Sequence, residues 1–382
     1  MKSTLRWSWP ILLVALLFLV PWAIHELAPS RVLDVVVVDK TVPFRDRIEH
    51  RSLFWLLNHL KIVKPDGAAY DRDRDYLGAF PGPTPGDPPA RTVDLTAERA
   101  RRADLVYLAD TYGVYRKDLE SGPAMKAALE RSQPLYGGLT LKEAEAARAA
   151  LAAGKTVIAE FNTLGSPTDA EARRTLEAAL GVRWTRWIGR YFPRLEDRDE
   201  VPGWLRRDYE TEWGRKWEFT GPGTVLLQDD EHCEVLRVGV ESPRVPLRLE
   251  RVHPPDPVLE EAADGTSYPY WFDVVEAARG TEVLANFRFR LEPAGLARLK
   301  ARGLKEVFPA VTRRGAPKGG VAWYFAGDFA DNPMPDGRVP FAGYLTARRW
   351  FEGLKLSPSE LEFYWRFYAP MMARLLDGVK HR

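Results

Sequence analysis

Cysteine is almost absent from this sequence, since Cys233 is the only one in 382 residues. A single cysteine excludes an intrachain disulfide and a cysteine-rich metal site. An excess of either charge is missing as well, because 55 Lys and Arg residues balance 53 Asp and Glu residues to a net charge of +2. Since the two signs are interspersed along the chain, there is no signal for nucleic acid, and we expect no such partner.

Loops and clusters that hold phosphates or metals are also missing. The pairs Gly137-Gly138 and Gly319-Gly320 show neither the Lys-Ser/Thr ending of a P-loop nor the spacing of a dinucleotide-binding loop. His232 follows three acidic residues, but no second histidine lies three or four positions away, so the spacing of metal ligands is absent. We therefore expect no metal and no cofactor.

The sequence does contain one long hydrophobic run, Trp7 to Ile24, which follows the basic residues Lys2 and Arg6. A membrane-spanning helix needs about 20 mainly apolar residues, so the run predicts a single span in the lipid bilayer. Because positive charge precedes it, the N-terminus is expected in the cytoplasm and the rest outside. We predict a signal anchor over residues 1–29, in the cell membrane, and an extracytoplasmic body over residues 30–382.

A cleaved signal peptide is the alternative for this N-terminal segment. Cleavage requires small residues one and three positions before the cut. The candidate cuts after Ala23 and Ala28 place Pro21 and Glu26 at the third position. These poor sites favour the uncleaved anchor.

Strands and helices alternate in the first half of the body, which is typical of a parallel sheet with helices on both faces. The best-defined helix begins at Thr140, where Glu143 completes a capping box, and ends at Gly154. A short apolar strand follows it. Strands are predicted at residues 33–38, 104–109 and 156–159, and helices at 48–62, 141–152 and 166–180. The predicted fold class is α/β with a mainly parallel sheet.

The second half is rich in strands and includes a Trp- and Arg-rich stretch over residues 182–217 without clean periodicity. Its aromatic side chains either fill a core or lie exposed to bind sugar rings or lipid headgroups. We predict a β-rich insertion at about residues 182–280, with mainly antiparallel strands because the loops are short. Strands are predicted at 225–228, 234–238, 246–251, 268–275, 282–291, 307–313 and 321–326, and helices at 293–301 and after a cap at Ser357–Glu360, with a kink at Pro370.

Polar residues follow the predicted parallel strands, at the edge where open α/β sheets bind ligands. Tyr112, Trp323 and Tyr324 would offer stacking surfaces for a glycan. Alternatively, Asp39 and Asp110 cap the helices that follow them, and Glu160 pairs with Lys40 or an arginine. The predicted ligand-binding residues are Asp39, Lys40, Asp110, Thr111, Tyr112, Glu160, Asn162, Thr163 and Asp328, with Asp331 and Asn332 just beyond.

Three segments together resemble the class I glutamine-amidotransferase-like fold, a flavodoxin-like α/β architecture. They are the strand DLVYLAD ending at Asp110, the helix, glycine turn and strand around Gly154-Lys155, and the segments VLANFRF and FPAVTRRGAPKGGVAWYFAGDF ending at Phe329. The resemblance covers about half of the body and is similar to non-glutaminase branches, such as trimerisation domains of bacterial β-galactosidases. It implies a flavodoxin-like sheet with helices on both faces.

The chain departs from the working enzymes of that family. A glutaminase of this fold needs a Gly-x-Cys-x-Gly turn after the strand that ends here in Glu160-Phe161-Asn162. Cys233 lies elsewhere among acidic residues, which raise a thiol pKa and weaken its nucleophilicity. We therefore expect neither a glutaminase nor a cysteine hydrolase.

Three functions stay open after these exclusions. The first is a membrane-anchored envelope protein that binds a saccharide or another envelope component without catalysis. The second is a glycan hydrolase, with Glu160 and either Asp110 or Asp328 as acid and base, which requires suitably spaced carboxylates. The third is a scaffold in a membrane complex, with a membrane-protein partner or a second copy of the chain.

Overall fold

The computed structural model describes residues 5–84, 86–121, 132–228, 232–243, 247–354 and 361–379. Its main element is a mixed ten-stranded sheet. The strand order is β14 (Thr266–Ser267), β13 (Leu247–Arg251), β16 (Glu282–Phe289), β17 (Val307–Gly315), β18 (Val321–Phe325), β9 (Thr156–Glu160), β6 (Leu105–Asp110), β2 (Val35–Asp39), β4 (Tyr76–Phe80) and β5 (Arg91–Thr92).

The five central strands, β18, β9, β6, β2 and β4, run parallel to one another. Numbered along the chain from β2, their spatial order from β4 to β18 is 2-1-3-4-5, the order of flavodoxin-like sheets. The order reverses between β2 and β6. The predicted α/β class is therefore confirmed, whereas the sheet is mixed and not mainly parallel, and only its core is parallel. The carboxyl ends of β2 and β6 meet at the switch point, the place where open α/β sheets commonly bind ligands.

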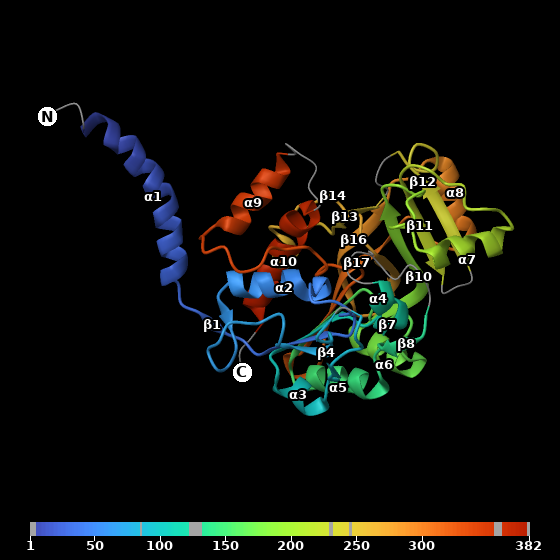
Figure 1. Cartoon of the computed structure of the whole chain (residues 1–382), viewed down its shortest axis with the longest axis horizontal. Coiled ribbons are helices and arrows are strands. Elements are labelled where there is room, and N and C mark those ends of the chain that lie inside the picture. Colours follow the sequence, from blue (N-terminus) through green and yellow to red (C-terminus); the bar gives the residue numbers. More distant parts are fainter. Residues whose placement is uncertain are drawn as a thin grey trace.

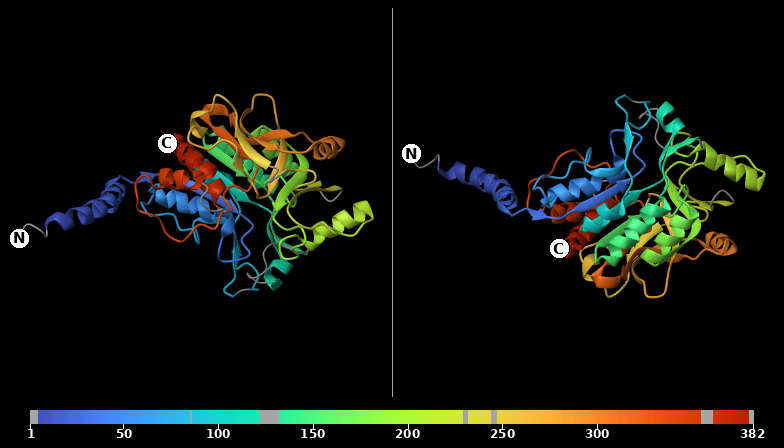
Figure 2. Two further views of the ribbon diagram at one scale, coloured as in Figure 1. Left: turned by 90° about the horizontal axis from the view of Figure 1, so that it is seen from above. Right: turned by 90° about the horizontal axis from the view of Figure 1, so that it is seen from below.

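Helices cover both faces of this core. On one face lie α2 (Ile48–His59) and α10 (Ala369–Gly378), and on the other lie α3 (Ala97–Arg102), α5 (Leu141–Ala152) and α6 (Ala170–Leu180) (Figures 1 and 2). Because both faces are covered, every residue of β2 (VVVVD) is buried. A run of β-branched residues suits such a doubly covered strand.

Helix α5 forms where its capping signal predicts it. The Thr140 side chain accepts a hydrogen bond from the Glu143 amide, and the Glu143 carboxylate accepts one from the Thr140 amide. Its alanines at 144, 146, 147 and 150 are buried against the sheet and neighbouring helices. The helix therefore delivers β9 into the centre of the parallel core.

A second, four-stranded antiparallel sheet falls within residues 182–277. Its order is β12 (His232–Arg237), β11 (Gly223–Gln228), β10 (Val182–Phe192) and β15 (Phe272–Ala277), and α7 (Gly203–Trp213) and α8 (Pro293–Ala301) accompany it. Two strands of the same stretch, β13 and β14, join the main sheet instead. Trp184 and Trp187 are buried, which places these two tryptophans in a core.

The remaining elements complete the body. Four helices were not predicted: α3, α4 (Arg116–Ser121), α7, and α9 over Tyr344–Gly353. A π-helical turn over Tyr364–Tyr368 leads directly into α10, where Pro370 occupies the first turn. The predicted cap at Ser357–Glu360 lies outside the described residues. The short elements are β1 (Arg31–Val32), β3 (Ile62–Val63), β7 (Val114–Tyr115), β8 (Pro134–Tyr136), α4 (Arg116–Ser121) and single turns at Pro257–Leu259 and Pro317–Gly319.

Helix α1 (Leu5–Leu27) leaves the body at the N-terminal end (Figure 1). Within the described part of the chain, no helix combines the length and the apolarity that crossing a membrane requires. The structure therefore does not support the predicted span.

Candidate functional site

Asp39 and Asp110 lie at the point where the strand order reverses, at the carboxyl ends of β2 and β6. The Asp39 carboxylate contacts His50 Nδ1 of α2 at 2.5 Å and accepts the Thr41 amide at 2.9 Å. The Asp110 carboxylate accepts the Tyr112 amide at 2.6 Å and the Thr41 hydroxyl at 2.8 Å. Thr41 thus ties the two strand ends together. The predicted convergence of these two acids is what the structure shows.

Three more acids act electrostatically on this pair: Glu49 from the first turn of α2, and Asp328 and Asp331 from the loop after β18. We call the five residues Asp39, Glu49, Asp110, Asp328 and Asp331 the acid cluster. Burial raises the pKa of every member, and nearby cluster carboxylates add to the rise at four of them. Crowded carboxylates lose hydration and repel one another, so the neutral form of each is favoured.

Two members of the acid cluster titrate close to neutral pH. Burial raises the pKa of Asp110 to about 7, with the charges of Asp39 and Asp331 adding to it. Burial also raises the pKa of Asp331 to about 6, against the opposing charge of Arg190 and a hydrogen bond with Asp328. For Asp328, burial and then the charge of Asp331 raise the pKa well above its ordinary value. The cluster therefore holds protons as well as negative charge.

Two buried oxygens of the acid cluster have no hydrogen-bond partner among the described residues. They are Glu49 Oε2 and Asp328 Oδ1. A buried acceptor without a donor carries a cost of about 1–3 kcal/mol. Donors that arrive with a ligand would relieve that cost, which makes the cluster a candidate binding site.

A cationic and aromatic wall borders the acid cluster. The Arg190 guanidinium of β10 lies 4.9 Å from the Phe192 ring centre and 5.7 Å from that of Trp271. Its charge acts on Asp331 and Asp328. The Trp271 ring stacks on Phe161 at 6.1 Å, and Trp271 itself is only half-buried. The wall provides flat surfaces and one cation beside a set of acceptors.

Lys40 is adjacent to Asp39 in the chain but turns to the opposite side of the sheet. Its Nζ donates to Glu143 at 2.7 Å and to the Gly138 carbonyl at 2.9 Å, and lies 3.2 Å from Asp94. Lys40 is 1% exposed. Its interactions anchor the capping box of α5, so Lys40 is a structural residue, and its partner is Glu143 and not Glu160.

Glu160 is also occupied by the protein itself. Its Oε2 accepts the Tyr107 hydroxyl at 3.1 Å and the amides of Phe329 and Ala330 at 3.1 and 3.2 Å. Glu160 is 0% exposed, and burial raises its pKa well above the ordinary value. This full burial argues against direct contact between Glu160 and a ligand.

The other predicted residues after β6 and β9 have mixed positions. The Thr111 hydroxyl donates to the Asn162 carbonyl at 3.2 Å, and the Thr163 hydroxyl donates to the Glu160 carbonyl at 2.8 Å. Both threonines are fully buried and hold the loops together. Asn162 is 9% exposed, whereas Tyr112 is half-buried with its ring 4.8 Å from that of Tyr115. Of this group, Tyr112 is next to the acid cluster, because its amide donates to Asp110, and its half-buried side chain is accessible to a ligand.

Two predicted stacking residues are wrong for physical reasons. Trp323 and Tyr324 lie in β18, in the centre of the sheet, and are 5% and 0% exposed. The Tyr324 hydroxyl donates to Asp273 inside the protein. Because both faces of the sheet are covered here, neither side chain leaves a surface on which a sugar could stack.

Glu49, His50 and Arg190 belong to the site but were not predicted for it. Glu49 and His50 follow β2 on the first turns of α2, where acids complement the helix dipole in many proteins, so their types gave no signal. Arg190 comes from a strand of the second sheet. Only the fold brings it to the acid cluster.

Cys233 and His232 of β12 interact with other residues of the protein and not with the acid cluster. Burial and then the charges of Glu212 and Asp208 raise the pKa of the Cys233 thiol, which is 0% exposed. His232 Nδ1 lies 2.9 Å from Glu212. Across the described residues, no group of three or more His, Cys, Asp or Glu side chains is placed to hold a metal ion.

Comparison with known proteins yields distant structural similarities only. No protein-family profile matches the sequence, and neither does any curated protein. The cytoplasmic protein STM3548 from Salmonella typhimurium is similar with a TM-score of 0.40 and 12% identity, over 92% of this chain and 100% of that one. A ThuA-like protein from Bacteroides uniformis has a TM-score of 0.36 and 10% identity, over 81% and 87% of the two chains. The exo-β-1,4-mannosidase Op5Man5 from Opitutaceae bacterium strain TAV5 has a TM-score of 0.31 and 9% identity, over 92% of this chain and 36% of that one.

Proposed function

We propose that this chain binds a saccharide at the acid cluster and does not transform it. The observation that carries the proposal is the set of carboxyl groups at the β2/β6 switch point, two of whose buried oxygens lack donors. The unpaired carboxyl oxygens can accept hydrogen bonds and a protonated carboxyl can donate one, and the hydroxyl groups of a sugar both donate and accept. The half-buried rings of Tyr112 and Trp271 offer the apolar surface that binding sites combine with a few polar groups.

The absence of a nucleophile supports binding over turnover. The turn after β9 carries Glu160, Phe161 and Asn162, without cysteine or serine, and Cys233 is buried in β12. We also propose that the fold is a nucleophile-free form of the amidotransferase-like architecture, as the sequence segments predict. Localisation in the envelope stays a prediction from the N-terminal segment.

A second candidate, carboxylate-dependent glycan hydrolysis, is favoured by one observation. Asp110 and Asp331 have pKa values of about 7 and about 6, which suits general acids near neutral pH. If the chain is a hydrolase, these two residues and not Glu160 supply the acid and base. Loss of turnover with retained binding in Asp110→Asn would select this candidate.

Glycan-array binding of the full chain tests the proposal, repeated with Asp110→Asn and Glu49→Gln. We expect specific binding that both substitutions weaken at least about tenfold, because each leaves a buried polar group unpaired at a cost of about 1–3 kcal/mol. Asp273→Asn is the matched control, because burial raises the pKa of Asp273 to about 7 as well, but Tyr324 and Trp184 are its partners. Absence of binding to any glycan would refute the saccharide and favour the scaffold function.

A further inference from the structure

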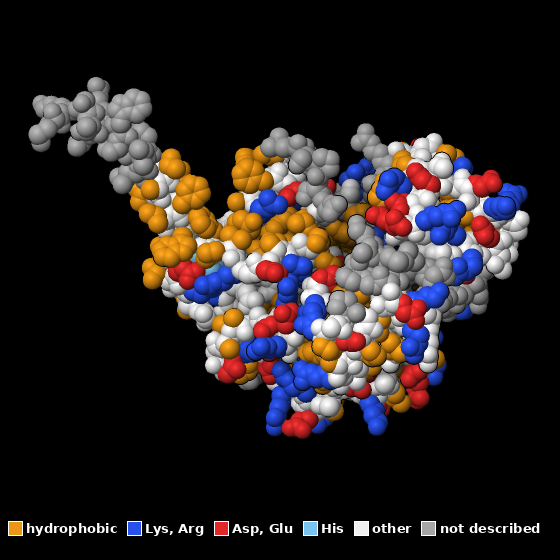
Figure 3. All heavy atoms as spheres, viewed as in Figure 1, with side chains coloured by type: hydrophobic (Ala, Val, Ile, Leu, Met, Phe, Trp, Pro, Cys, Tyr) orange, Lys and Arg blue, Asp and Glu red, His pale blue; other side chains and the backbone are white. Residues whose placement is uncertain are grey.

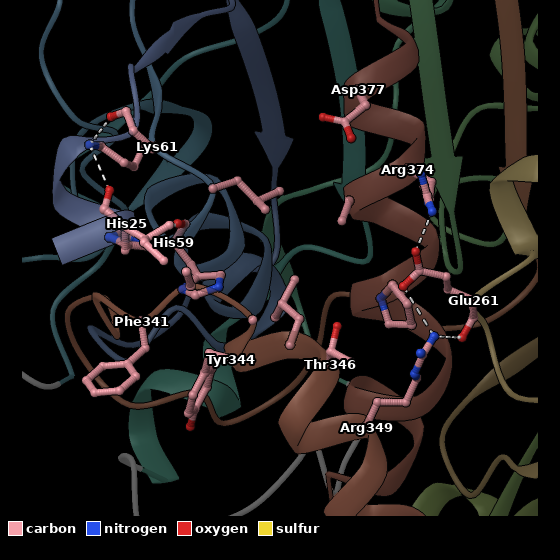
Figure 4. Close-up of a pocket in the computed structure, with 18 of the residues that line it drawn as sticks. His25, His59, Lys61, Glu261, Phe341, Tyr344, Thr346, Arg349, Arg374 and Asp377 are labelled. Atoms are coloured by element: carbon pink, nitrogen blue, oxygen red, sulfur yellow. Dashed lines mark hydrogen bonds and ion pairs between the residues drawn. The ribbon is translucent and has the colours of Figure 1, made fainter. Parts of the chain in front are cut away.

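Helix α1 is fastened to the body beside the segment that precedes α9. The Ala342 amide donates to the Pro21 carbonyl at 3.1 Å, and the rings of Phe18 and Phe341 pack edge to face at 6.1 Å. Lys61 Nζ donates to the carbonyls of His25 and Glu26 at 3.1 and 2.9 Å, at the carboxyl end of α1. Figure 4 draws Lys61 beside His25. These contacts place α1 and α9 on the same edge of the molecule (Figure 1).

The described turns of α1 are apolar around the whole helix. Leu17, Phe18 and Leu19 are three successive residues that point in different directions, and they are 68%, 62% and 56% exposed. No charged residue occurs between Leu13 and Ile24. A helix that is hydrophobic all round belongs in a protein core or in lipid. A groove on a protein partner would cover one side only, so the apolar side chains all round this helix fit a lipid environment better.

Helix α9 exposes large apolar side chains on its outer side, although Tyr344 and Leu345 pack against the core. Trp350, Phe351 and Leu354 point outward and are 62%, 52% and 43% exposed. Its charged residues face the protein instead, since Arg349 donates to the Glu261 carbonyl at 2.6 Å and Arg348 lies over the Trp365 ring at 5.0 Å. Surface helices normally turn their apolar face inward. The exposed apolar side chains make the outer face of α9 a candidate contact surface.

Apolar side chains of α1 and α9 gather along one edge in the space-filling view (Figure 3). A cavity of about 470 Å³ lies between the two helices, with Lys61, Arg349 and Arg374 among its lining residues (Figure 4). Arginine and tryptophan side chains at the boundary of an apolar surface are typical of proteins in contact with the lipid interface. We infer that this α1–α9 edge binds the surface of a lipid bilayer, with α1 in the apolar layer and Trp350 and Phe351 at its boundary.

A fluorophore attached to α9 tests the inference directly. Cys233 is 0% exposed, so a cysteine introduced as Leu354→Cys can be labelled selectively in the full chain. With vesicles of phosphatidylcholine and phosphatidylglycerol, we expect a blue shift of an environment-sensitive dye at this position. The same dye at Lys305→Cys, whose side chain is 75% exposed near α8, should not shift. Equal shifts at both positions, or none at residue 354, would overturn the inference.

Vesicle flotation gives an independent measurement. The variant Trp350→Ser/Phe351→Ser should lower the partition coefficient of the full chain about tenfold or more, since it removes two aromatic side chains that the bilayer would bury. Trp213→Ser, which removes a 39% exposed tryptophan of α7, is the matched control and should leave it unchanged. If the double variant instead dissociates a dimer in sedimentation velocity and vesicle binding is absent, the edge joins two copies and the inference is wrong.

Discussion

Replacing Lys40 by methionine should destabilise the protein strongly, because Lys40 forms an ion pair with the buried carboxylate of Glu143. Lys40 and Glu143 are 2% and 1% exposed in their side chains, and their charged atoms lie 2.7 Å apart. Breaking a buried pair by removing one partner costs about 3–5 kcal/mol, since the other charge remains buried. The Gly138 carbonyl loses its donor as well. We therefore expect Lys40→Met to lower the free energy of unfolding by about 3–5 kcal/mol.

A double-mutant cycle separates the pair from the general effect of a core change. Glu143→Gln keeps the shape of the side chain and its contacts with Thr140, but it removes the negative charge. In Lys40→Met/Glu143→Gln neither charge remains, so the combined loss should be smaller than the sum by about 1–3 kcal/mol. Urea unfolding followed by circular dichroism measures all four proteins. Arg102→Met, at an exposed pair on α3, is the control and should change stability by less than about 1 kcal/mol.

Two results would refute this reasoning. One is a loss below about 1 kcal/mol for Lys40→Met, which would mean that water or rearrangement neutralises the buried carboxylate. The other is strict additivity in the cycle, which would mean that the two charges do not interact. Either result would also remove the structural role assigned to Lys40 and return it to the list of ligand-binding candidates.

Three further predictions concern the acid cluster, a close backbone approach and the single thiol. Burial raises the pKa of Asp110 from 3.8 to about 7, so its ionised form is disfavoured in the folded state. The free energy of unfolding should therefore fall as pH rises from about 4 through 7. Urea unfolding at a series of pH values should show a smaller fall for Asp110→Asn. A Cβ on Gly78 would lie 1.7 Å from the Asp39 carbonyl, so Gly78→Ala should lower the melting temperature far more than Gly67→Ala, which has a similarly positive φ but open space. Buried Cys233 should react with a thiol reagent only on unfolding, and rapid reaction in native buffer would contradict its placement in β12.

The sheet and its acids were predictable because their signals are local. Apolar runs ending in Asp39, Asp110 and Glu160 fix three neighbouring strands, and the Thr140-Glu143 capping box fixes the helix that precedes β9. Parallel strands bring their carboxyl ends to one edge, so the sequence predicts an acidic edge. It does not predict which of those acids a ligand reaches.

The direction of each side chain is what the local signals leave undetermined. Asp39 and Lys40 are adjacent, and successive side chains of an extended segment point to opposite faces. Asp39 therefore meets His50 of α2, whereas Lys40 meets Glu143 of α5 on the other face. The sequence predicts that both residues lie at the end of the strand, but it does not predict which helix covers which face of the sheet. Arg190 shows the stronger limit, since it reaches the site from a separate sheet through long-range packing alone.

The burial of Glu160 explains how an acid after β9 serves a site that it does not touch. Its carboxylate holds the amides of Phe329 and Ala330, and these residues lie between Asp328 and Asp331. The loop that carries two members of the acid cluster is thus fixed by a hydrogen-bonded carboxyl group in the core, which Tyr107 orients in turn. A nucleophile at that turn would have to be exposed, whereas this chain uses the position to fix its neighbours. The same residue that argues against direct catalysis therefore supports a preorganised binding site.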